Sequence, residues 1–319
     1  MNSLPSLADI RAAAARIRPY ARRTPVLTCG AVDARAGARV FMKCENMQKV
    51  GAFKFRGACN AVFALTDEES RRGVVCHSSG NHAQALALAA RLRGIPAHIV
   101  MPSNAPEVKK AAVAGYGGRI NYCEPTLAAR EETQARVIAE TGATEIHPFN
   151  NTRIIAGQGT ATLELLEEVP DLDVVIAPVG GGGLLSGTAT AAKGLNPSIR
   201  VIGAEPQRAD DAARSLAAGR VLPSENPRTI ADGLLTSLCD LTFSVIRERV
   251  ERIITVREEA IPDAMRFVWE RAKIIIEPSA AVGFATLWEG QLDTRGLRIG
   301  IIVCGGNVDL ARLPWQAGA

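Results

Sequence analysis

Residues 174–185 read Val-Val-Ile-Ala-Pro-Val-Gly-Gly-Gly-Gly-Leu-Leu, an apolar run that stops at four glycines and continues as a helical pattern to residue 193. Because the run does not alternate with polar residues, it predicts a strand buried on both faces, as in a parallel sheet covered by helices. The glycines let the backbone approach an anion closely, and the helix that follows adds its dipole. Residues 299–304, Ile-Gly-Ile-Ile-Val-Cys, form a second run of this kind.

Around these two runs, apolar β-branched segments alternate with longer helical ones. Strands are predicted at 39–44, 73–77, 97–101, 119–122, 173–179, 200–204 and 298–304. Helices are predicted at 56–65, 81–93, 107–114, 127–141, 157–168, 184–193, 259–272 and 280–289. This alternation predicts an α/β protein with mostly parallel sheets, in which ligands collect at the carboxyl ends of the strands.

The composition excludes several classes of protein. The chain has 319 residues, of which 47% are hydrophobic and 22% charged, as in a folded globular protein. The net charge of +4 is interspersed and aromatic residues make up 4%, so we expect no nucleic-acid partner. No apolar run approaches the roughly 18 residues of a membrane span, so no membrane association is expected. Seven widely spaced cysteines without a CxxC pair, and the absence of a signal-peptide core, favour a reducing, cytoplasmic compartment.

Lys54 lies between two phenylalanines in residues 51–57, Gly-Ala-Phe-Lys-Phe-Arg-Gly, just before a predicted helix. A lysine in such a position is usually a surface residue whose apolar stem packs on its neighbours. The functional interpretation is a lysine held in an apolar pocket. Desolvation would then lower its pKa from about 10.4, and the neutral amine could bond covalently to an aldehyde cofactor.

Two further loops follow predicted strands. Residues 78–84, Ser-Ser-Gly-Asn-His-Ala-Gln, open a predicted helix and present free backbone N–H groups that suit a carboxylate or phosphate. An ordinary Ser or Asn helix cap gives the same pattern. Residues 304–307, Cys-Gly-Gly-Asn, end the last predicted strand, where a buried cysteine is normally only a small apolar residue. The four loops together are far more specific than any one of them.

In this order, and with Ala-Gly-Gln-Gly-Thr at 156–160, the four loops resemble those of the fold type II family of pyridoxal-phosphate enzymes, which share the tryptophan synthase β-like fold. Within that family the chain is most similar to serine racemases and short threonine/serine dehydratases, from about residue 24 to residue 309. The resemblance implies two open, mostly parallel sheets and a homodimer. It also implies a large cofactor-binding domain from residues 1–73 and 149–319, with a smaller domain of residues 74–148 inserted in it.

The resemblance further implies a role for individual residues. Lys54 would hold pyridoxal 5'-phosphate and remove the substrate α-proton, while the four glycines would bind the cofactor phosphate. Asn81 would bind the ring hydroxyl, Cys304 would face the ring nitrogen, and Ser79 would exchange a proton on the face opposite Lys54. The implied cofactor-binding residues are Phe53, Lys54, Asn81, Gly180, Gly181, Gly182, Gly183, Leu184 and Cys304. The implied substrate-binding residues are Ser78, Ser79, Gly80, Asn81, His82 and Arg130.

Acidic residues after another predicted strand suggest a cation site. Ala-Glu-Pro at 204–206 follows a predicted strand, and Ala-Asp-Asp at 209–211 comes shortly after. Carboxylates and a backbone carbonyl are oxygen ligands that suit Mg²⁺, Mn²⁺ or Ca²⁺, although acidic loop residues are usually only solvated. Serine racemase-like proteins have the same pattern with a divalent cation, so the resemblance implies ligands at Glu205, Ala209 and Asp211.

The activity implied by the resemblance is that of an ammonia-lyase, which removes water from L-threonine or L-serine and yields a 2-oxo acid and ammonia. One alternative substrate is 3-hydroxyaspartate, because Arg130 could meet its second carboxylate, and serine racemisation is another alternative. From a different class, the chain could be a non-catalytic phosphate-binding module that uses the glycine loop. Such a module would not need a lysine between two phenylalanines.

Overall fold

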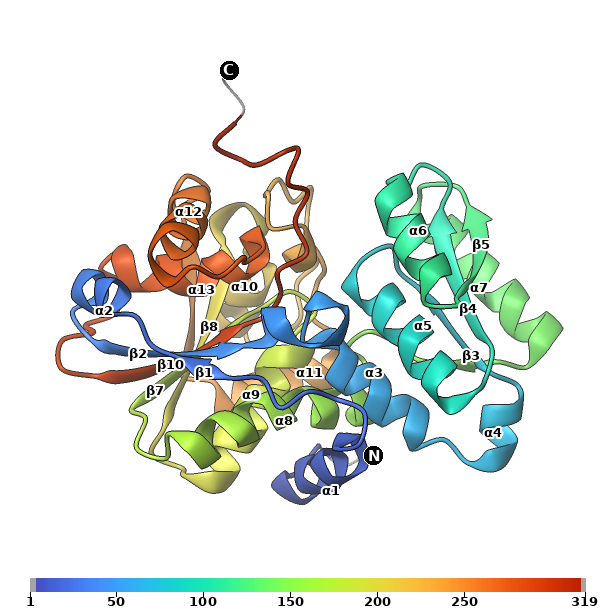
Figure 1. Ribbon diagram of the computed structural model, residues 1–319, viewed down its shortest axis with the longest axis horizontal. Helices are drawn as coiled ribbons and strands as arrows, with labels where there is room; N and C mark the ends of the chain where they lie inside the picture. The colour runs from blue at the N-terminus through green and yellow to red at the C-terminus, as the bar shows by residue number, and fades with distance from the viewer. Residues whose placement is uncertain (1–3, 317–319) are drawn as a thin grey trace.

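The computed structural model describes residues 4–316, which form two parts, each with its own sheet (Figure 1). The larger sheet has six strands in the order β1-β2-β10-β7-β8-β9, and the smaller has four in the order β5-β4-β3-β6. Neighbouring strands run parallel, except that β1 is antiparallel to β2. This arrangement confirms the predicted α/β class with two mostly parallel sheets.

Both ends of the chain contribute strands to the larger sheet. Its strands are β1 (Val26–Leu27), β2 (Arg39–Cys44), β7 (Val174–Pro178), β8 (Arg200–Pro206), β9 (Arg252–Val256) and β10 (Arg298–Val303). Its helices are α1 (Leu7–Ile17), α2 (Gly30–Ala36), α3 (Lys54–Phe63), α8 (Thr152–Glu168), α9 (Gly183–Leu195), α10 (Asp211–Ala218), α11 (Asp240–Arg249), α12 (Ala260–Ala272) and α13 (Pro278–Trp288). Every residue of β7 is buried, because α8 and α9 cover one face of the sheet and α12 and α13 the other (Figure 1).

The smaller sheet is built from one continuous part of the chain. Its strands are β3 (Val74–His77), β4 (Ala97–Pro102), β5 (Arg119–Cys123) and β6 (Thr144–Glu145), and its helices are α4 (Asp67–Arg71), α5 (Asn81–Arg93), α6 (Glu107–Gly115) and α7 (Leu127–Thr141). The domain boundary at residues 73 and 74 stays a prediction. Phe55 and Val62 of α3 share a buried apolar cluster with β3 and α5, so α3 packs against both parts.

Arg56, two residues after Lys54, is the centre of a buried charge network. It pairs with Glu45 through two hydrogen bonds of 2.7 and 2.8 Å and with Glu164 through two of 2.8 Å. Lys43 donates to Glu164 at 2.6 Å, so two cations balance two carboxylates. Leaving a buried charge unpaired costs about 3–5 kcal/mol, so this network fixes the start of α3 and, with it, the backbone of Lys54.

Across the described residues, we find no helix that combines the length and the apolar character needed to span a bilayer.

Candidate active site

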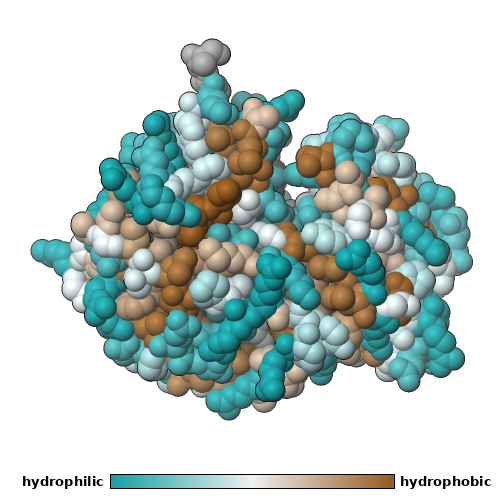
Figure 2. All heavy atoms as spheres, in the orientation of Figure 1, coloured by the Kyte–Doolittle hydropathy of each residue, from teal (hydrophilic) through white to brown (hydrophobic). Residues whose placement is uncertain are grey.

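Three of the four predicted loops are joined by hydrogen bonds where the strands of the two sheets end. The Phe53 N–H donates to the Cys304 carbonyl at 2.9 Å. The Asn307 amide nitrogen donates to the Asn81 side-chain oxygen at 2.9 Å and to the Val50 carbonyl at 2.7 Å. Figure 2 shows the surface hollowed between the two parts of the molecule.

The fourth loop, Gly180 to Gly183, joins this group through residues 146–149. Gly182 has φ 83° and is the N-cap of α9, which therefore begins without a side-chain cap. A Cβ atom at Gly181 would lie 2.3 Å from the Phe149 ring, so only glycine allows this approach. The preceding residue, Pro148, accepts a hydrogen bond of 3.2 Å from the Lys54 amine. Sequence reasoning gave Pro148 and Phe149 no role.

The Lys54 amine has an environment that favours its neutral form. Burial lowers the pKa of Lys54 to about 8, although Cys304, Cys76 and Glu277 act in the opposite direction. Burial also raises the pKa of the Cys304 thiol well above its ordinary value, so the thiol stays protonated. The lowered pKa raises the fraction of neutral amine near pH 7, and the neutral amine is the form that bonds to an aldehyde.

Two histidines beside Lys54 are neutral and fixed by the backbone. His82 is 2% exposed and its Nε2 donates to the Ile146 carbonyl at 2.8 Å, which leaves its buried Nδ1 without a partner in the described part of the chain. The Nδ1 of His147 accepts the Asn150 N–H at 2.8 Å. Burial lowers the pKa of His82 to about 3 and that of His147 to about 4. Both histidines are therefore poor bases, and they shape the site.

The loop before α5 has the geometry of a binding loop rather than of a side-chain cap. The N-cap of α5 is Gly80, and no side chain caps this helix. Ser78 Oγ accepts the Gly80 N–H at 3.3 Å, which holds the turn. Ser79 therefore does not cap α5, and free N–H groups remain at the helix start.

Asn81, the first residue of α5, contacts a residue that sequence reasoning missed. Its amide nitrogen donates to both carboxylate oxygens of Glu277, at 3.2 and 3.3 Å. Nothing in the local sequence distinguishes Glu277 from an ordinary residue ahead of a proline-initiated helix. Asn307 belongs to the Cys-Gly-Gly-Asn segment, which the sequence predicted to lie at the site. The hydrogen bonds of Asn307 to Asn81 and Val50 were not predicted.

Arg130 on α7 faces the carboxyl end of β3. Its charge adds to burial in lowering the pKa of His77, the last residue of that strand and the neighbour of Ser78. The Arg130 Nε is buried and has no hydrogen-bond partner within residues 4–316. The arginine therefore has an unused donor close to the binding loop.

The predicted cation ligands lie at the carboxyl end of β8. Glu205 is fully buried, and its two oxygens accept the N–H groups of Ala212 and Ala213, both at 2.9 Å. Asp211 is 1% exposed, and both of its carboxylate oxygens lack a partner among the described residues. Burial raises the pKa of Glu205 to about 8 and that of Asp211 to about 6.

Within residues 4–316 no three His, Cys, Asp or Glu side chains group around a point that could hold a metal. The predicted set has only two carboxylates, with a backbone carbonyl at Ala209 as the third ligand. A buried carboxylate without a partner is costly, and an oxygen-preferring cation would remove that cost. The residues present therefore fit such a cation.

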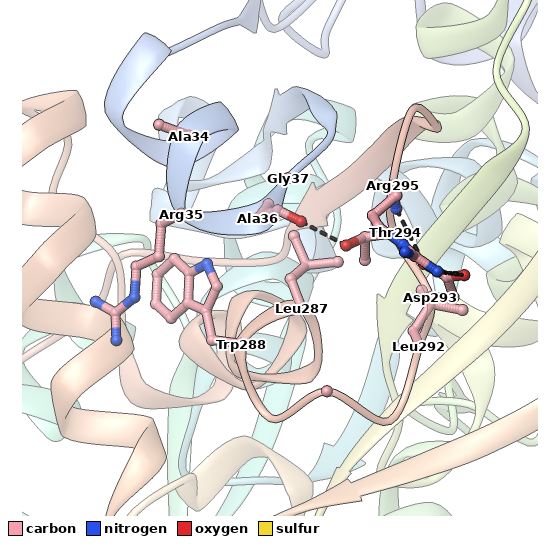
Figure 3. Close-up of a pocket in the computed structure, with 11 residues that line it drawn as sticks. Ala34, Arg35, Ala36, Gly37, Leu287, Trp288, Leu292, Asp293, Thr294 and Arg295 are labelled. Atoms are coloured by element: carbon pink, nitrogen blue, oxygen red, sulfur yellow. Dashed lines mark hydrogen bonds and ion pairs between the residues drawn. The ribbon is translucent and has the colours of Figure 1, made fainter.

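A surface groove of about 690 Å³ lies apart from these loops (Figure 3). It is lined by α2, the end of α13 and the turn to β10, with Arg35, Trp288 and Arg295 among its residues. These segments precede β2 and β10, whereas the functional loops follow the strands. The groove is therefore at the opposite edge of the larger sheet and outside the candidate active site.

The half-buried Lys54 amine, the glycine turn and the uncapped helix start fit the binding of a phosphorylated aldehyde. The chain belongs to the family described as pyridoxal-phosphate dependent enzyme, which matches residues 17–305.

Individual relatives match nearly the whole chain. A β-hydroxyaspartate dehydratase of Paracoccus denitrificans is 51% identical over 313 residues, which cover 98% of this chain and 99% of the relative. A serine racemase of Oryza sativa subsp. japonica is 52% identical over 314 residues, covering 97% and 92%. The solved structure of maize serine racemase has a TM-score of 0.96 at 51% identity and covers 99% of this chain and 97% of that one.

Proposed function

We propose that the protein is an ammonia-lyase that eliminates water from a β-hydroxy amino acid and releases a 2-oxo acid and ammonia. The observation that carries this proposal is the Lys54 amine, whose pKa is lowered to about 8 by burial and which lies beside the glycine turn and the binding loop. A phosphate-binding module would leave this amine without a role. The relatives named above, a dehydratase and serine racemases, support an enzyme of this class.

The residues present fit pyridoxal 5'-phosphate, which supplies an electron sink for the α-carbon when bound. Lys54 would hold it covalently, with Phe53 beside that bond. The uncapped start of α9, formed by Gly180 to Gly183 and Leu184, would bind its phosphate through free N–H groups. Cys304 would present a neutral thiol to the ring nitrogen, and Asn81 would donate to the ring hydroxyl.

The substrate would be held by the loop between β3 and α5. Ser78, Ser79, Gly80 and the N–H groups of Asn81 and His82 would bind the α-carboxylate at the helix start. Lys54 Nζ would then remove the α-proton as a general base. The small part of the molecule would exclude water from the site when it closes.

Serine and threonine are candidate substrates, and Arg130 favours 3-hydroxyaspartate. A buried guanidinium nitrogen without a partner suits a second carboxylate, which serine and threonine lack. The β-hydroxyaspartate dehydratase at 51% identity supports the same substrate. An assay of 2-oxo acid release from serine, threonine and each 3-hydroxyaspartate isomer tests the function. Release from none of them would overturn it.

Arg130→Ala should lower kcat/KM for 3-hydroxyaspartate about tenfold to a hundredfold and leave serine nearly unaffected, because a hydrogen bond to a charged group contributes about 1.5–3 kcal/mol. Steady-state kinetics on both substrates measure the difference. Arg136→Ala is the matched control, since Arg136 lies on the same helix and its exposed side chain pairs with Glu140 at 3.5 Å. Equal losses on both substrates would show that Arg130 does not select the second carboxylate.

We also propose that Glu205, the Ala209 carbonyl and Asp211 bind Mg²⁺, Mn²⁺ or Ca²⁺. A chelator should then lower the melting temperature and the divalent cation should restore it, since a ligand at a hundredfold excess over its Kd stabilises the folded state by about 2.7 kcal/mol. Thermal melts with and without chelator measure the effect. Glu205→Ala and Asp211→Ala should abolish the response, and Asp210→Ala, which removes the exposed partner of Arg214 and no predicted ligand, should keep it. A melting temperature that ignores the chelator would contradict the site.

Two properties of the whole molecule belong to the same proposal. All seven cysteines are free, which agrees with a reducing, cytoplasmic compartment.

The exposed apolar side chains of Met47 and Ile275 belong to neighbouring segments, because Asn46, next to Met47, donates a hydrogen bond of 2.9 Å to the Ile275 carbonyl. Exposed apolar residues that lie together support a homodimer. Sedimentation equilibrium should give twice the chain mass, and a single-chain mass would contradict the dimer.

A further inference from the structure

Glu277 is a buried carboxylate at the junction of the two parts of the molecule. It is 4% exposed and precedes α13. Its Oε2 accepts the Asn307 N–H at 3.0 Å, and both oxygens accept the Asn81 amide nitrogen. Asn307 in turn donates to the Asn81 side-chain oxygen, so the three residues form a closed set of hydrogen bonds.

The network specifies an acceptor at position 277. The Asn307 amide nitrogen donates a hydrogen bond to the Asn81 side-chain oxygen, so the Asn81 amide nitrogen points toward Glu277. A carboxylate can accept both this N–H and the Asn307 backbone N–H, whereas a glutamine would place its own donor against one of them. The acceptor oxygens of Glu277 therefore fix which way the Asn81 amide points.

This arrangement is costly, which argues for a purpose beyond packing. Burial raises the pKa of Glu277 to about 7 and the nearby Asp232 adds to the shift, so the ionised form is disfavoured despite its hydrogen bonds. Lys109, Lys54 and Cys304 are the other titratable groups that interact with it. Proteins keep such unfavourable groups mainly at functional sites.

Asn81 is the first residue of α5, the helix that follows the binding loop, and it belongs to the part of the molecule built around the smaller sheet. Glu277 and Asn307 belong to the larger part, 196 and 226 residues further along the chain. Their hydrogen bonds thus connect the binding loop to the end of β10, next to Cys304. A second link, the ion pair of Lys109 with Asp232 at 3.0 Å, is largely exposed and should contribute little.

We propose that Glu277 is a positioning residue that acts through Asn81, holding the amide of Asn81 and the 78–82 loop in the orientation that binds the amino acid. This inference rests on the proposed function, because it assumes that the loop binds the substrate carboxylate. It assigns Glu277 no contact with substrate. Loss of the carboxylate should weaken amino-acid binding while leaving attachment to Lys54 intact.

The test uses the cofactor-loaded protein and titrates it with glycine, which has no β-hydroxyl to lose, while following the visible absorbance. Glu277→Gln should weaken glycine binding about tenfold to a hundredfold and raise KM for the hydroxy amino acid similarly, with a much smaller change in kcat. Without glycine the variant should still show the visible absorbance of the lysine-bound cofactor. Asp232→Asn is the matched control, since it removes a carboxylate that links the same two parts, and it should not weaken glycine binding by more than about twofold.

A double-mutant cycle separates positioning from a general structural role. Because Glu277 acts through Asn81, the Glu277→Gln/Asn81→Ala double variant should bind glycine no more weakly than Asn81→Ala alone. Losses that multiply, or Glu277→Gln binding glycine as tightly as the unmutated protein, would overturn the proposal. If Glu277→Gln does not fold, Asn307→Ala breaks the same network and should show the same weakening and the same lack of additivity. Unmutated protein that binds glycine but releases no 2-oxo acid would refute the lyase assignment instead.

Discussion

Lys54→Ala should abolish both the visible absorbance of the lysine-bound cofactor and the release of 2-oxo acid. The substitution removes the amine that would hold the cofactor and also the proposed base for the α-proton. A general base alone contributes about a hundredfold to ten-thousandfold, and losing covalent attachment adds to this effect. We therefore expect activity to fall by at least about a thousandfold, measured by 2-oxo acid release and by the absorbance spectrum.

Lys49→Ala is the matched control for this experiment. Lys49 lies five residues earlier, and its amine is 5.5 Å from the centre of the Phe55 ring rather than in the site. The Lys49 variant should keep both the absorbance and the activity. A cofactor–lysine adduct that can still be trapped by reduction in the Lys54 variant would disprove the assignment.

The sequence predicted the parts of the fold that depend on local pattern. The run that became β7 is apolar on both faces. Parallel strands bring their carboxyl-end loops to one edge of a sheet, so the meeting of the loops with Cys304 and Gly180, which follow β10 and β7, is expected from topology. Asn81 follows β3 of the smaller sheet, and its place beside them depends on how the two parts pack. β9 was missed because Arg252–Val256 is only partly buried and its apolar run is short. β1 and β6 have two residues each, too few for any periodicity to be read.

The rest of the site depends on contacts between residues far apart in the sequence. Glu277 meets Asn81 across 196 positions, and Arg56 meets Glu164 across 108. The Pro148 carbonyl that accepts from Lys54 is a backbone group and carries no side-chain signal. Such partners are selected by packing of the finished fold, so a local pattern cannot name them.

The structure sharpens the interpretation of Ser79. A helix cap was the ordinary explanation for its hydroxyl, and the cap of α5 is instead Gly80, without a side-chain contribution. Two roles remain for Ser79, a ligand of the substrate carboxylate or a proton carrier on the face opposite Lys54. A hydroxyl is a weak base, so the second role needs a neighbouring acceptor, for which a cofactor phosphate is the natural group.

We expect the unmutated protein to interconvert L- and D-serine, or to consume D-serine, in addition to its main elimination reaction. Ser79→Ala should lower the rates of serine racemisation and of D-serine consumption by about a hundredfold or more. Elimination from the L-substrate should be largely retained, because Lys54 serves that face. Chiral chromatography of serine incubated with each variant measures both activities. Ser78→Ala is the matched control, since it removes the neighbouring hydroxyl that accepts the Gly80 N–H and should affect the two enantiomers alike. If the unmutated protein neither forms nor consumes D-serine, or if Ser79→Ala loses L- and D-side activities equally, Ser79 is a carboxylate ligand and the second proton carrier does not exist.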